Sequence, residues 1–406
     1  MAFLIAVWMV LPCGVIAQNP IFIGNVPLPE DVSVQDDAGL PVSGVWIGKW
    51  DNWRNHILVV EGLNADGLVD VVYAVASTQN GRGNWLRLEA KIEGDALVST
   101  DDSLPVRYSM SPTGRMRAVF GDNERFAVLE RQDISAVLSS PDDDWFLVGE
   151  LERLETDLVE DDAPVELAAV IYTTRGEGPF PLAVIHHGST GTGRQSVWFR
   201  HVWTNDWLAD VLNENGYIAA FPQRRGRGGS DGLYDEGFSA DRSDGYSSDA
   251  AIAIAGADRA LEDANAALAA LRNRSNVQPG PALLAGVSRG GVVAIMQAGQ
   301  RQNDIIGVIN FVGGWVSEGC CDTPINPPLF RRIGSFDGPI LSIYGEDDTH
   351  YSIAHARANI AEMERLGANS DLIVTDVPGF GKGHWVTAYP YLWEEAVGDY
   401  LNALAR

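Results

Sequence analysis

One serine of the sequence stands in a pattern that is typical of nucleophilic catalysis. The pentapeptide Gly286-Val287-Ser288-Arg289-Gly290 directly follows an apolar run at 281–285 and opens an amphipathic stretch at 290–301. This order predicts a strand, a sharp turn and a helix, with the Ser288 hydroxyl held at the N-terminus of the helix. A second match to the pattern surrounds Ser230, but it lies in a polar glycine-rich loop with no helix after it. We therefore predict that Ser288 is a nucleophile and that Ser230 is a turn residue.

His384 is the predicted base, because a serine hydroxyl is a poor nucleophile until a base takes its proton. Of the seven histidines, only His350, His355 and His384 follow the serine in the chain. That is the order that a serine, acid and histidine triad has on a doubly wound sheet. His384 lies in a glycine-rich loop after a predicted strand at 371–377, whereas the other two histidines fall at the start of a predicted helix.

The acid that would orient the histidine and stabilise its charged form is predicted to be Asp348. It is the third residue after Gly345, at the end of a predicted strand at 339–344. Asp347 is the main alternative, and Glu346 is a weaker one.

Two backbone amides are candidates for the oxyanion hole that a tetrahedral intermediate needs. One belongs to Arg289, the residue after the nucleophile. The other belongs to Ser189, in the loop after a predicted strand at 181–187. The alternative is that this loop is only a tight exit turn. His186 and His187 do not predict a zinc site, because adjacent residues of a strand point to opposite faces.

The elements that position these residues form an α/β pattern from residue 145 to residue 406. Strongly apolar runs alternate with amphipathic stretches, which predicts a doubly wound, mainly parallel sheet with helices on both faces. The predicted strands are 165–173, 181–187, 217–221, 281–285, 305–312, 339–344 and 371–377. The predicted helices are 197–214, 249–273, 290–301, 355–366 and 390–405.

Residues 44–132 have a different pattern, with short alternating runs bounded by Gly, Asn, Asp and Pro. The runs predict a small antiparallel β domain, either a barrel or a sandwich. Trp46 and Trp50 would plug its interior or serve a binding surface. Residues 18–43 lack clear periodicity and predict a linker or extended arm.

Residues 1–17 form an apolar stretch that ends in Val-Ile-Ala and predicts a signal peptide, and hence a secreted or periplasmic protein. No basic residue precedes the apolar run, so a misassigned start codon is the alternative. No later segment is apolar enough to span a bilayer. The formal charge of −26 (29 basic and 55 acidic residues) argues against nucleic acid and anionic lipid as partners.

The chain resembles the dienelactone-hydrolase-like branch of the α/β-hydrolase superfamily, with motifs in the family order from 145 to 406. These motifs are PLAVIHHGSTG (181–191), YIAAFPQRRGRGGSDG (217–232), GVSRGG (286–291), IYGEDD (343–348) and GKGHW (381–385). The resemblance implies hydrolysis of carboxylic esters through an acyl-enzyme, with Ser288, Asp348 and His384 as the triad and no cofactor or metal. Family members proper use cysteine where this chain has serine. Residues 44–50 in turn resemble the opening of lipocalin-like barrels.

Two other functions stay open at this point. The GVSRGG motif also fits prolyl-oligopeptidase-like peptidases or amidases, and a hydrolase scaffold can carry an inactive binding protein. An ester substrate is the expected partner. Trp315 and Trp385 are candidate pocket residues, and core packing is the alternative for Trp315. Cys320 and Cys321 form either a vicinal disulfide or two free thiols.

Overall fold

The computed structural model divides into two compact units, Met1–Gly121 with Arg125–Phe146, and Asp122–Glu124 with Leu147–Arg406. The structure describes residues 20–34, 40, 42–50, 54–77, 83–111, 114–121, 125–141, 145, 149–174, 176–321, 324–378 and 381–405. The predicted signal peptide lies outside these residues. None of the described helices is both long and apolar enough to cross a membrane.

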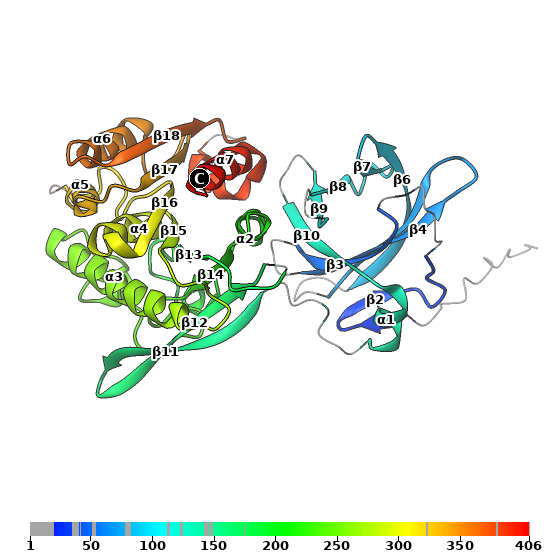
Figure 1. The fold of residues 1–406 in the computed structure, drawn as a ribbon, viewed down its shortest axis with the longest axis horizontal. Coiled ribbons are helices and arrows are strands. Elements are labelled where there is room, and N and C mark those ends of the chain that lie inside the picture. The colour runs from blue at the N-terminus through cyan, green and yellow to red at the C-terminus, as the bar shows by residue number, and fades with distance from the viewer. Residues whose placement is uncertain are drawn as a thin grey trace, which may run out of the picture. The chain divides into compact units, whose positions relative to one another are not determined.

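The first unit contains a closed antiparallel barrel in the order β10-β3-β4-β5-β6-β7-β8-β9 (Figure 1). Its strands are β3 (Gly44–Trp50), β4 (Asn55–Leu63), β5 (Val69–Val75), β6 (Asn84–Glu93), β7 (Ala96–Ser99), β8 (Val106–Met110), β9 (Met116–Phe120) and β10 (Arg125–Gln132). Between the two architectures that the sequence allowed for this region, the structure has the barrel. Closure leaves no free sheet edge for another chain to pair with.

Alternate residues of the barrel strands bury on opposite faces of the wall. Leu58 and Val60 of β4 belong to one core cluster, together with Trp46 and Trp50. These side chains fill the interior, and the Trp46 indole donates to the carbonyl of Val42 at 2.8 Å. The two tryptophans therefore pack inside the barrel, which is the first of the two roles that the sequence allowed them.

His56 is fully buried against the rings of Trp50, Tyr73 and Tyr108 and is held by two hydrogen bonds. Its Nδ1 lies 2.8 Å from the carbonyl oxygen of Ala74, and its Nε2 lies 2.9 Å from the Tyr108 hydroxyl. Burial lowers the pKa of His56 from 6.5 to about 4, because the charged ring would lose its hydration. The imidazole is therefore neutral at pH 7.

The prediction that residues 18–43 form a linker or extended arm is wrong where the structure describes them. A hairpin of β1 (Ile21–Ile23) and β2 (Val26–Leu28) packs on the outer face of the barrel with α1 (Ile134–Ser139). Ile23 and Val26 are fully buried there. The strands are too short for sequence periodicity to indicate, and the hairpin is held by the apolar outer face of β4 and β5.

The second unit is an eight-stranded sheet in the order β11-β12-β14-β13-β15-β16-β17-β18. Its strands are β11 (Glu150–Glu160), β12 (Ala163–Tyr172), β13 (Leu182–His186), β14 (Ile218–Pro222), β15 (Ala282–Val287), β16 (Ile305–Phe311), β17 (Pro339–Gly345) and β18 (Asn369–Thr375). Its helices are α2 (Asp206–Glu214), α3 (Ala250–Arg272), α4 (Arg289–Gln300), α5 (Asn326–Phe330), α6 (Ile353–Glu364) and α7 (Glu394–Leu404).

Strands β13 to β18 run parallel to one another, whereas β11 and β12 pair antiparallel with their neighbours. Helices α2 and α7 pack together on one face, and α3 to α6 cover the other (Figure 1). The predicted doubly wound α/β class is confirmed. It brings the carboxyl ends of β13, β15 and β17 to one edge of the sheet, where the candidate residues follow the strands.

Candidate active site

Ser288 is the single residue between β15 and α4, and its backbone conformation is strained. Its φ of 57° and ψ of −120° are a combination that costs a non-glycine residue energy and that occurs mainly at functional sites. The turn leaves no space for a side chain at Gly290, because a Cβ there would come within 2.0 Å of the His186 carbonyl oxygen. The strand-to-helix turn expected from the sequence is present, with the serine at the helix N-terminus.

Ser230, the serine of the second sequence match, has a purely structural environment. Its hydroxyl donates to the carbonyl of Gln223 at 2.6 Å and accepts from the backbone amide of Ala168 at 2.8 Å. These bonds fasten the glycine-rich loop to β12. The structure therefore agrees with the interpretation of Ser230 as a turn residue.

His384 and Asp348 meet directly. The His384 Nδ1 lies 2.9 Å from the Asp348 Oδ2, and none of the Asp348 side chain is exposed. Their loops touch at Gly383, where a Cβ would come within 2.1 Å of the Glu346 carbonyl oxygen. Glu346 and Asp347 are exposed, so Asp348 is the one of the three candidate acids that contacts the histidine.

The environment of Asp348 keeps its carboxylate ionised. Burial opposes the charge, but hydrogen bonds from His350 and His384 outweigh burial and hold the pKa of Asp348 well below its usual value. The backbone amide of His350 donates to Oδ1 at 2.7 Å, which leaves Oδ2 for His384. An ionised carboxylate in this position selects the His384 tautomer with its proton on Nδ1 and leaves Nε2 free to act as a base.

The loop after β13 lies beside the nucleophile. A Cβ at Gly188 would be 3.3 Å from the Ser288 Cβ and 3.9 Å from its Oγ. Within the described part of the chain, the backbone amides of Ser189 and Arg289 have no hydrogen-bond acceptor. The next residue, Thr190, is fixed by the Tyr246 hydroxyl, which accepts from its amide at 3.1 Å. The two amides that the sequence suggested as oxyanion donors are thus available.

A buried ionic cluster surrounds the Arg289 side chain, and no sequence pattern predicted it. The Arg289 guanidinium donates to the Trp315 and Glu236 carbonyl oxygens, both at 2.9 Å, and stacks 3.7 Å from the Tyr246 ring centroid. Glu236 also accepts from Arg224 at 2.6 Å. Burial opposes the Glu236 charge, but the two arginines outweigh it and lower its pKa. Arg289, directly after the serine, and Glu236, in a polar loop, are the sequence features that could have indicated it.

The two candidate pocket tryptophans have different environments. Trp315 is 1% exposed and packs 4.5 Å from the Arg289 guanidinium, so its ring is core packing and does not line an open pocket. This burial favours core packing, which is the alternative that the sequence left open for Trp315. Trp385 is 59% exposed, and its ring centroid lies 6.4 Å from that of His384. This exposed aromatic surface is available to a substrate at the histidine.

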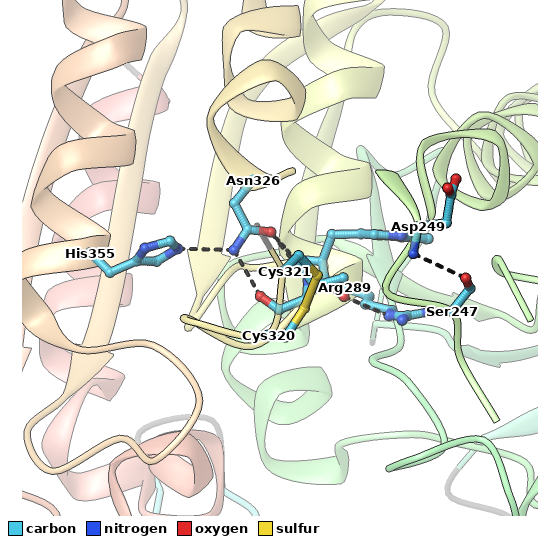
Figure 2. The surroundings of a disulfide bond; sticks show 9 residues. Ser247, Asp249, Arg289, Cys320, Cys321, Asn326 and His355 are labelled. Carbon is cyan, nitrogen blue, oxygen red and sulfur yellow. Dashed lines mark hydrogen bonds between the residues drawn. A yellow bond between two sulfur atoms is a disulfide. The ribbon is translucent and has the colours of Figure 1, made fainter. Parts of the chain in front are cut away.

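Cys320 and Cys321 are joined by a disulfide in the loop between β16 and α5 (Figure 2). The loop is tied down by Asn326, whose side chain accepts from the Trp315 amide at 2.9 Å and contacts the His355 Nε2 at 2.9 Å. Of the two states that the sequence allowed, the structure has the disulfide.

One group of side chains in the described part of the chain has ligand atoms close enough together to hold a metal ion. Asp348, His350 and His384 place one ligand atom each within 4.8 Å of one another. Asp348 and His384 are already bonded to each other. A metal ion would therefore have to compete with this hydrogen bond.

A mainly parallel sheet with helices on both faces and a serine on a strained strand-to-helix turn is the α/β-hydrolase fold. The family model "Dienelactone hydrolase family" matches residues 167–375, and the chain belongs to that family of hydrolases. The match begins in β12, ends in β18 and includes Ser288 and Asp348. No curated protein matches the chain.

Several solved structures are similar to the chain at low identity. An esterase from Pyrococcus furiosus is 16% identical, with a TM-score of 0.43 over 63% of this chain and 90% of that one. Est1E from Butyrivibrio proteoclasticus with bound ferulic acid is 16% identical, with a TM-score of 0.42 over 63% and 97%. An acylaminoacyl peptidase in complex with a chloromethyl ketone is 13% identical, with a TM-score of 0.44 over 93% and 56%.

Proposed function

We propose that this hydrolase cleaves carboxylic esters through an acyl-enzyme formed on Ser288. The observation that carries the proposal is the contact between His384 and the buried Asp348, on the same sheet edge as the strained serine. This set of residues supplies a nucleophile, a base and the anion that orients the base.

The proposed reaction begins as the Ser288 Oγ attacks the ester carbonyl carbon while His384 Nε2 accepts the hydroxyl proton. The carbonyl oxygen becomes an oxyanion, and the amides of Ser189 and Arg289 donate to it. The intermediate collapses as His384 gives its proton to the leaving alcohol, which leaves an acyl group on Ser288. Water then attacks this ester with His384 again as the base, and the carboxylic acid leaves.

The test compares two serines of the same local sequence pattern. We expect Ser288→Ala to lower kcat/KM for p-nitrophenyl acetate and butyrate by at least about 1,000-fold, because the nucleophile is gone. Ser230→Ala, the matched control, should retain the activity per folded molecule. Residual ester hydrolysis by Ser288→Ala above a tenth of the wild-type rate would contradict the proposal, as would equal losses in both variants.

The same assay separates ester from amide chemistry. The wild-type enzyme should turn over p-nitrophenyl esters with a higher kcat/KM than aminoacyl p-nitroanilides, because p-nitrophenolate is a better leaving group than p-nitroaniline. Faster turnover of the anilides would assign the chain to the peptidases instead. A wild-type chain that hydrolyses neither class would be an inactive scaffold.

A further inference from the structure

Ser189, one of the two proposed oxyanion donors, lies between two backbone groups that other residues hold in place. The first is the Gly188 carbonyl oxygen. The His187 Nε2 accepts from the Arg224 amide at 3.1 Å, so the ring proton is on Nδ1, which donates to this carbonyl oxygen at 2.8 Å. The Arg227 guanidinium also donates to it, at 3.3 Å. Because the peptide bond is planar and trans, the Ser189 N–H is held pointing away from these donors.

The second of these groups is the amide of Thr190, and Tyr246 holds it. The Tyr246 hydroxyl accepts from the Thr190 amide at 3.1 Å and lies 2.9 Å from the Thr190 Oγ1 and 2.7 Å from the Tyr234 hydroxyl. A phenol has one proton to donate and two lone pairs, so these three contacts use its whole hydrogen-bonding capacity. The hydroxyl is therefore fixed at the residue that directly follows the donor.

The backbone around Tyr246 packs on the same loop. The Tyr246 amide donates to the Thr192 carbonyl oxygen at 3.2 Å. A Cβ at Gly245 would come within 2.1 Å of that carbonyl oxygen, so the two segments are in close backbone contact. Backbone packing as well as the hydroxyl thus fixes Tyr246 against the loop that contains Ser189.

The ring of Tyr246 contacts the residue that supplies the other proposed donor. Its centroid lies 3.7 Å from the Arg289 guanidinium carbon. The guanidinium also donates to the carbonyl oxygens of Trp315 and Glu236, both at 2.9 Å, which keeps it under the ring. Arg289 is the first residue of α4, and its amide is the second proposed oxyanion donor. One side chain therefore links the two segments whose amides would bind the oxyanion.

We propose that Tyr246 is a positioning residue for the oxyanion hole. Its ring rests on the Arg289 side chain, and its hydroxyl holds Thr190 so that the Ser189 amide keeps its direction towards the developing oxyanion. The inference rests on the proposed function of the site and deepens it. The motifs of the sequence do not include Tyr246, which lies in the polar segment between β14 and α3.

The test removes only the hydroxyl, with Tyr246→Phe in the full chain. The aromatic contact with Arg289 is kept, but the Thr190 amide loses its acceptor. Losing one oxyanion donor outright costs about 100- to 1,000-fold in kcat, so a donor that is only loosened should cost less. We expect kcat for p-nitrophenyl acetate to fall about tenfold with KM changed less than twofold, because the Ser189 amide acts on the oxyanion and not on the bound ester.

Trifluoroacetophenone reports on the oxyanion hole without a leaving group. The Ser288 Oγ adds to the carbonyl carbon of this ketone, the hydroxyl proton passes to His384, and the ketone oxygen becomes an oxyanion at the proposed donors. We expect the inhibition constant of the ketone to rise by about the factor by which kcat falls. A variant that merely contained less folded protein would show a lower kcat but an unchanged inhibition constant.

Tyr400→Phe is the matched control, because it removes another hydroxyl that makes hydrogen bonds to the backbone. The Tyr400 hydroxyl donates to the Pro339 carbonyl at 2.7 Å and accepts from the Val308 amide at 2.9 Å, in β17 and β16. This variant should keep kcat, KM and the inhibition constant within about twofold of the wild-type values.

Tyr246→Phe with unchanged kcat, or with a lower kcat and an unchanged inhibition constant, would overturn the positioning role. Equal losses in Tyr400→Phe would also overturn it, since any hydrogen-bonded hydroxyl would then suffice. Failure of the proposed function is a distinct result. In that case the wild-type chain would neither hydrolyse the ester nor bind the ketone, and the proposal for Tyr246 would fall with it.

Discussion

Replacing Asp348 with asparagine should remove most of the activity while leaving the site's shape intact. The carboxylate is wholly shielded from solvent, and its Oδ2 lies 2.9 Å from the His384 Nδ1. When His384 takes the serine proton, two unit charges face each other across this bond. Charges about 4 Å apart at an effective dielectric constant of about 20 attract each other by about 4 kcal/mol. The asparagine side chain is uncharged and does not supply this attraction, and the loss of about 4 kcal/mol corresponds to a fall of about 1,000-fold in kcat.

The assay is steady-state hydrolysis of p-nitrophenyl acetate by Asp348→Asn and, as a matched control, by Asp347→Asn. Asp347 precedes the proposed triad acid but is exposed, so its variant should stay within about twofold of the wild-type kcat. KM should change little in either variant, since the carboxylate does not touch the substrate. Asp348→Asn that keeps more than a tenth of the wild-type kcat would refute the reasoning, and an equal loss in Asp347→Asn would move the acid to that residue.

Two further predictions concern stability and use equilibrium unfolding by denaturant as the measurement. Glu236→Gln should lower the free energy of unfolding by about 3–5 kcal/mol, because it leaves the buried guanidiniums of Arg224 and Arg289 without their anion. Glu166→Gln, which removes the anion of an exposed pair, should lower it by less than about 1 kcal/mol. Similar losses in the two variants would contradict the importance of burial. The pKa of His56 falls from 6.5 to about 4 on folding, so its contribution to stability is complete above pH 6.5 and is lost as the pH falls towards 4. The loss is about 3 kcal/mol and should be absent from His56→Gln; parallel pH profiles of the wild-type chain and the variant would refute it.

The places of the candidate residues in the fold could be predicted because their signals are local. The serine is flanked by glycines between an apolar strand and a helix, and the acid and the histidine follow later strands. Because the sheet is parallel, all three residues lie at the carboxyl edge of the sheet. The place of Asp348 as the third residue after Gly345 favoured it over Glu346 and Asp347, but only the structure shows which carboxylate turns inward to meet His384.

Features that depend on contacts between distant segments could not be predicted. β11 was missed because its alternate residues are mostly charged, with Leu154 and Leu158 as its buried side chains, and it is held as an edge strand by pairing with β12.

The central claim is that Ser288 is the nucleophile, and covalent labelling tests it most directly. The wild-type chain is treated with a fluorophosphonate, and the modified peptide is identified by mass spectrometry. We predict one adduct per chain, on Ser288, and loss of ester hydrolysis in proportion to labelling. An adduct on another residue, or full labelling with the activity retained, would contradict the claim.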